Sequence, residues 1–193
     1  MKSLKLQTQL TNLSAHKKSR LEVSNWVIEN PESLKELLNY CFKIDEDISY
    51  KSAWVLEYVC NDRLDLLIPH LTLFLKNIPK AYKNQSIRPF SKICLMLVKS
   101  NYIKKESKVI DAMNLQIKKA MTECSFDWLI SNQKVASQAY AMDTLYLLGT
   151  EIDWIHPELK IIIEQNIPNK TAAYKARGRM TLEKISKFQN KGK

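Results

Sequence analysis

The sequence predicts an all-α fold, a right-handed superhelix of stacked antiparallel helix pairs with about 8–10 helices. Apolar residues recur every three to four positions through most of the chain, and no segment alternates apolar and polar residues. Only 3 glycines and 6 prolines occur among the 193 residues, too few for the many tight turns of a β-sandwich or barrel. One stretch of helical pattern also recurs 88 residues further along the chain, which indicates an internal repeat.

The composition is that of a globular protein with a single domain, residues 1–193. Hydrophobic residues make up 45% and charged residues 26%, a balance that excludes intrinsic disorder. The cysteines lie far apart in apolar helical segments, which predicts buried, reduced thiols. They are Cys41, Cys60, Cys94 and Cys124. The chain shows neither a secretory apolar region nor an apolar run of roughly 20 residues, so we expect a soluble, cytoplasmic protein without a membrane span.

The first two predicted helices meet at a proline. Leu21, Val23 and Val27 follow the helical spacing and predict a helix over residues 16–29. This helix ends at Asn30, because the residue before a proline is pushed out of the α region. Pro31 suits the first turn of the next helix, over residues 31–43, because a proline lacks the N–H that would be unpaired there.

A third helix is predicted over residues 49–61 and a fourth over residues 66–78. In the third helix, Trp54 and Tyr58 lie one turn apart and form a neighbouring aromatic pair beside the apolar stripe. The fourth helix is very apolar and tolerates Pro69 only near its start, because an interior proline removes a backbone hydrogen bond.

The C-terminal part of the chain predicts five further helices. They cover residues 87–100, 108–130, 134–149, 156–165 and 171–188. The helix over residues 134–149 is apolar around most of its circumference, so we expect it to be packed on two sides. Gly149 marks its C-terminal end, a common place for glycine.

The recurring stretch is Tyr50–Lys76, which aligns without a gap on Gln138–Glu164. The identical pairs are Ala53 and Ala141, Tyr58 and Tyr146, Asp65 and Asp153, Pro69 and Pro157, and Leu71 and Leu159. In both copies an aspartate stands four residues before a proline. We expect this aspartate to cap the second helix of each copy and the proline to open it.

This pattern resembles the HEAT and armadillo classes of helical repeat, whose paired-helix units recur about every 40–47 residues. Half of 88 is 44, so a divergent middle copy fits between the two aligned ones. The resemblance implies units at about 16–44, 45–81, 84–131 and 134–167, followed by the terminal basic helix 171–188. It also implies a concave binding face, usually formed by the second helix of each pair. The alternative is a non-repetitive helical bundle in which two helix pairs look alike by chance.

The net charge of +10 is concentrated in bands. Residues 76–105 carry eight lysines and arginines and no acidic residue, and residues 170–193 carry eight and one. These bands supply the candidate residues for binding nucleic acid or another anion. They are Lys80, Lys83, Arg88, Lys92, Lys175, Arg177 and Arg179. The alternative is an ordinary solvated surface, which the excess of lysine over arginine favours.

The sequence shows little that points to catalysis. It has no zinc-protease, nucleophile-elbow or phosphate-loop motif, and its three histidines are not spaced to share one helix face. We therefore expect no catalytic residue, no metal and no cofactor. Helical-repeat DNA glycosylases for alkylated bases are the one enzymatic relative considered, and that resemblance implies a groove with tryptophans and an acidic residue. Trp54, Asp153 and Trp154 are the candidates for such a groove.

These observations favour a non-enzymatic interaction or scaffold module that binds another protein on the concave face of a helical repeat. The alternative is a nucleic-acid-binding helical repeat, with a glycosylase-like repair protein as its enzymatic extreme. The two differ in their response to salt, because phosphate binding weakens steeply as salt is added.

Overall fold

The structure, a computed structural model, describes residues 2–191, and its regular elements are all helical in that range. The α-helices are α1 (Lys2–Thr11), α2 (Lys17–Glu29), α3 (Leu34–Cys41), α4 (Ile48–Asp62), α5 (Leu71–Asn77), α6 (Asn84–Lys99), α7 (Ser107–Ala112), α8 (Leu115–Ile130), α9 (Val135–Leu148), α10 (Ile155–Asn166) and α11 (Ala172–Lys191). Short 3₁₀ segments are η1 (Pro31–Ser33), η2 (Leu64–His70), η3 (Ile78–Lys80) and η5 (Ile167–Asn169), and η4 (Ser100–Lys104) is a π-helical turn. The predicted all-α class is confirmed.

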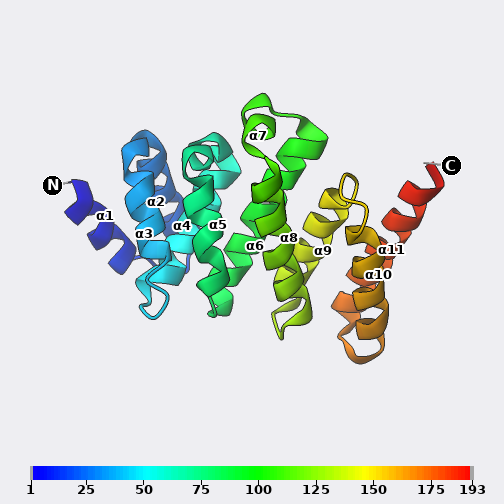
Figure 1. The fold of residues 1–193 in the computed structure, drawn as a ribbon. Helices are drawn as coiled ribbons and strands as arrows, with labels where there is room; N and C mark the ends of the chain where they lie inside the picture. The colour runs from blue at the N-terminus through cyan, green and yellow to red at the C-terminus, as the bar shows by residue number, and fades with distance from the viewer. Residues whose placement is uncertain (1, 192–193) are drawn as a thin grey trace.

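The helices form an elongated stack of two rows, with the two chain ends at opposite ends of the molecule (Figure 1). One row consists of α2, α4, α6, α9 and α11, in which each helix packs directly on the next. We call it the inner row. The outer row consists of α3, α5, α8 and α10. This two-row stack is the expected helical-repeat solenoid.

The inner row has far more extensive contacts between neighbouring helices than the outer row. Helices that lie closer together occupy the inside of a curved stack, so the inner row forms the concave side. In each predicted unit the inner-row helix comes first along the chain, and the terminal helix α11 completes the row. Whether an inner-row helix is the first or the second of its pair depends on where the units are divided, and the predicted unit bounds stay a prediction.

A continuous apolar core runs between the two rows from Leu6 to Ile185. Phe90 of α6 is fully buried in it. The Phe90 ring lies edge-on to Phe74 of α5, with centroids 5.7 Å apart, and 6.2 Å from the ring of Phe42, which follows α3. Phe90 of α6 therefore contacts both α5 and the residue that follows α3. Helix α9 packs against α6, α8, α10 and α11, which confirms that it is packed on more than one side.

The two aligned stretches each form a helix, a turn and a second helix, but their starts differ from the prediction. Pro69 lies in the 3₁₀ segment η2 and not in an α-helix, because proline has no N–H to donate to the carbonyl four residues earlier. Asp65 accepts hydrogen bonds from Arg63 Nε and Nη2, both at 2.8 Å, in place of a cap. Asp153 does not cap α10 either, since that helix begins without a side-chain cap.

The predicted single helix over residues 108–130 is in fact two helices, α7 and α8. The side chain of Asn114 accepts a hydrogen bond from the backbone N–H of Ile117 at 3.0 Å. This N-cap stabilises a new helix start and explains the break. Helix α1 was not predicted at all, although Leu6 and Leu10 are buried. These two differences account for eleven α-helices within residues 2–191, where about 8–10 were expected for the chain.

Gly149 ends α9 as predicted, but not through a left-handed conformation. Its φ is −69°, which any residue can adopt. The glycine is required by space: a Cβ there would lie 2.2 Å from Cδ2 of His156. His156 is buried, and its Nε2 donates a hydrogen bond to the carbonyl oxygen of Tyr146 at 2.8 Å. Gly149 therefore allows the imidazole to lie against the end of α9.

The four cysteines are buried and unbonded, as predicted. Burial raises the pKa of all four thiols, and it raises the pKa of Cys124 to about 12. Thiols with such pKa values behave as small apolar side chains. No helix within residues 2–191 is both long and apolar enough to cross a membrane.

Candidate interaction cleft on the inner row

A cleft of about 500 Å³ opens where α2, α4 and α6 of the inner row meet the segment before α9. The residues that line it are Ala15, Arg20, Trp54, Asn84, Gln85, Arg88 and Lys134. Three of these side chains are cationic and none is acidic. The cleft is therefore a basic site with one aromatic wall.

The aromatic wall is built by helical spacing on α4. Tyr50, Trp54 and Tyr58 are four residues apart and so share one face of that helix. The Tyr50 and Trp54 rings pack with centroids 5.0 Å apart. The guanidinium of Arg20, on α2, lies 5.5 Å from the Trp54 ring and 5.5 Å from the Tyr58 ring. These cation–π contacts hold the arginine at the cleft.

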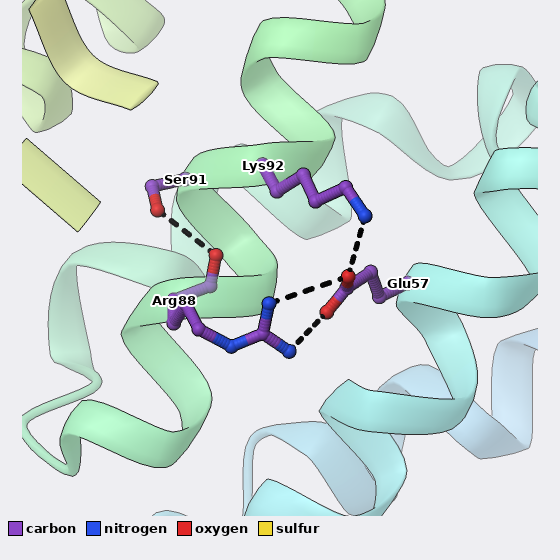
Figure 2. Close-up of polar contacts among 4 residues, drawn as sticks. All are labelled: Glu57, Arg88, Ser91 and Lys92. Atoms are coloured by element: carbon purple, nitrogen blue, oxygen red, sulfur yellow. Dashed lines mark hydrogen bonds and ion pairs between the residues drawn. The ribbon is translucent and has the colours of Figure 1, made fainter. Parts of the chain in front are cut away.

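Of the cleft-lining residues, Arg88 also binds a buried carboxylate that it shares with a second cation. Glu57 on α4 has a side chain only 6% exposed, and its oxygens accept hydrogen bonds from Arg88 Nη2 at 2.6 Å and Lys92 Nζ at 2.8 Å. Figure 2 shows Arg88 and Lys92 reaching from α6 to this one carboxylate, while Ser91 donates to the backbone oxygen of Arg88. Arg88 and Lys92 are one helical turn apart, which lets both reach Glu57.

The charges around the cleft do not balance. Glu57 supplies one negative charge against Arg88 and Lys92, and Arg20 and Lys134 add two more positive charges. Within residues 2–191 neither Arg20 nor Lys134 forms an ion pair with a carboxylate. The cleft therefore favours an anionic group.

Two polar atoms of the lining residues have no hydrogen-bond partner in the described structure. They are the donor Nε of Arg20 and the acceptor Oδ1 of Asn84, both shielded from solvent. Buried polar groups are normally paired, so each unpaired group needs an explanation. Because solvent does not reach these two atoms, they do not by themselves indicate a ligand in the cleft.

Replacement of Glu57 by glutamine is expected to lower the free energy of unfolding by about 2 kcal/mol, because two cations then lose their shared counter-charge. Their partial exposure keeps the loss below that of a fully buried pair. Urea denaturation followed by circular dichroism measures the change.

The matched control is Glu183→Gln, which breaks the exposed Glu183–Lys187 pair on α11. It should leave the denaturation midpoint unchanged. Equal losses in the two variants would contradict the structural role assigned to Glu57.

The structure brings only some of the predicted cations together. Arg88 and Lys92 meet at Glu57, whereas Lys83 contacts the backbone oxygen of Asp45 at 2.9 Å and Lys80 contacts Asn77 at 3.0 Å. On α11, Arg177 is bound by Asp143 of α9 at 2.7 Å. Lys184 binds the same carboxylate at 2.8 Å, while Lys175 and Arg179 lie elsewhere on α11. The first basic band is therefore spread over α6 and the segments on either side of it, the second lies mainly on α11, and each is partly neutralised.

The three candidates for a glycosylase-like groove are not brought together. Trp54 lines the inner-row cleft. Asp153 and Trp154 lie in the turn before α10, and Trp154 stacks on Phe126 of α8 with ring centroids 5.7 Å apart. In the described part of the chain, no group of three or more histidine, cysteine, aspartate or glutamate side chains could hold a metal ion.

Arg20, Asn84, Gln85 and Lys134 line the cleft but were not predicted as site residues. They come from three separate parts of the chain, and no local spacing connects them. Two predicted candidates do line the cleft: Arg88 of the basic band, and Trp54, which the sequence groups with Tyr58.

Comparison with known proteins gives one match. A family model described as a HEAT repeat domain matches residues 6–185, nearly the whole chain. No curated protein and no solved structure matches. The family match extends from α1 to α11, so it covers both rows of the stack.

Proposed function

The chain belongs to the HEAT repeat domain family, and from this premise we propose that it is a non-enzymatic interaction module that binds another protein through its inner row. The family supports a helical-repeat scaffold or interaction module. The observation that carries the finer proposal is the basic, aromatic-walled cleft at Arg20, Trp54 and Arg88. This cleft supports the proposal because its positive charge is only partly compensated and because curved repeats present an extended binding surface on their concave side.

The proposal is tested by site-specific photo-crosslinking in cells of the source organism. A photoreactive amino acid replaces Gln85, which is exposed at the cleft, or Gln165, which is exposed on α10 of the outer row. Because both positions are surface glutamines on helices, they differ mainly in the row they belong to. We expect a discrete protein adduct from position 85 and none from position 165. Adducts at position 165 alone would overturn the proposal.

Nucleic-acid binding is a second candidate, favoured by one observation. Part of each basic band lies on an inner-row helix, Arg88 and Lys92 on α6 and Arg177 and Arg179 on α11. Fluorescence anisotropy with mixed-sequence duplex and single strands at low salt tests this candidate. Affinity that falls steeply with salt, and that is abolished when Lys80, Lys83, Arg88 and Lys92 are replaced by glutamate, would support it. A nuclease-sensitive adduct at position 85 would support it as well.

A further inference from the structure

We propose that the cleft is the anchor site for an acidic segment of the partner protein, with a glutamate or aspartate carboxylate binding at Arg20 and Arg88. This inference rests on the proposed function and names the chemistry of its partner. It follows from the charge and the size of the cleft.

The charge of the cleft fits a carboxylate. Arg20 is oriented by the Trp54 and Tyr58 rings and carries no ion pair within the described residues, so its guanidinium charge is uncompensated. The Arg88 side chain is a third exposed even though Nη1 and Nη2 both contact Glu57. Planar guanidinium groups bind carboxylates with paired, charge-assisted hydrogen bonds.

The other cations of the inner row favour a peptide bound at this one cleft over a nucleic-acid backbone bound along the row. A nucleic-acid backbone needs several free cations in succession. Here Arg177 and Lys184 are bound to Asp143. Lys83 forms an ion pair with a carboxylate of the loop before α4. A cleft of about 500 Å³ has room for a few side chains of one peptide segment.

The test measures binding of short fluorescent peptides by anisotropy at low salt. One probe alternates glutamate and serine over about 15 residues, and the matched probe carries glutamine in place of every glutamate. We expect the glutamate probe to bind at least about tenfold more tightly. Arg20→Gln should weaken that binding about tenfold, with Arg20→Lys restoring part of it. Lys119→Gln, which removes one charge from the outer row, should leave it unchanged.

Lys134→Gln provides a second variant at the cleft, because Lys134 is exposed and its loss should not disturb folding. It should weaken binding of the glutamate probe, though less than Arg20→Gln does. Equal affinity for the glutamate and glutamine probes, or equal effects of Arg20→Gln and Lys119→Gln, would overturn the inference.

The inference can fail while the proposed function holds. Failure of the glutamate probe to bind, together with a protein adduct at position 85, would overturn the acidic anchor and leave the interaction module intact. A mixed-sequence single strand that binds more tightly than the glutamate probe would overturn the acidic anchor in favour of nucleic acid.

Discussion

Replacement of Phe90 by alanine is expected to lower the free energy of unfolding by about 4 kcal/mol and the melting temperature by roughly 10 °C. The ring is fully buried and contacts Phe74 and Phe42, so its removal leaves a cavity where three successive elements meet. In a stack where each element contacts only its neighbours, such a cavity weakens the coupling across the row. Thermal unfolding followed by circular dichroism at 222 nm measures the shift.

Two variants serve as comparison. Phe90→Leu keeps most of the apolar volume and should lose less than half as much stability. Ile161→Ala removes an apolar side chain that is 47% exposed on α10, and it should leave the melting temperature within about 1 °C of the parent. A Phe90→Ala protein as stable as the Ile161→Ala protein would show that the core is not continuous at α6.

Replacement of Gly149 by alanine is expected to lower the free energy of unfolding by about 3 kcal/mol. The new Cβ would lie 2.2 Å from Cδ2 and 2.6 Å from Nε2 of His156. The imidazole cannot easily move away, because it stacks on Tyr146 and lies edge-on to Phe188. Moving it would also lengthen the hydrogen bond to the Tyr146 carbonyl oxygen.

A double-mutant cycle with His156→Ala checks the cause. Without the ring the alanine at position 149 has room, so the double variant should be more stable than the sum of the two single losses predicts. Additive losses would show that Gly149 is needed for its backbone conformation and not for the space it leaves. The measured quantity is the free energy of unfolding in urea for all four proteins.

Local patterns in the sequence predicted most of the helices. The boundary at Asn30 and Pro31 was found because a proline restricts the residue before it, an effect that needs no tertiary contact. The break at Asn114 was missed because an asparagine inside an apolar helical pattern caps a new helix only when the chain turns there. For the two aspartates expected as helix caps the error was the opposite, because a cap was predicted where none forms. Asp65, for example, is bound by the nearby Arg63.

The candidate site was harder to predict than the fold. Arg88 and Lys92 were identified from charge alone, but their role depends on Glu57, 31 and 35 residues away along the chain. Charge counts cannot show that a carboxylate on α4 already holds these two cations. Nor can they show that Arg20, which contacts the Trp54 and Tyr58 rings, has no carboxylate partner among the described residues.

The sequence by itself determined that the chain is all-α and built of repeated helix pairs, because helical periodicity, prolines and caps act over a few residues. Only the tertiary structure decided which row lies inside the curve, why Gly149 must lack a side chain, and which cations remain available to a partner. Those properties depend on contacts between helices far apart in the chain, and packing brings these helices together in a way that no local spacing encodes.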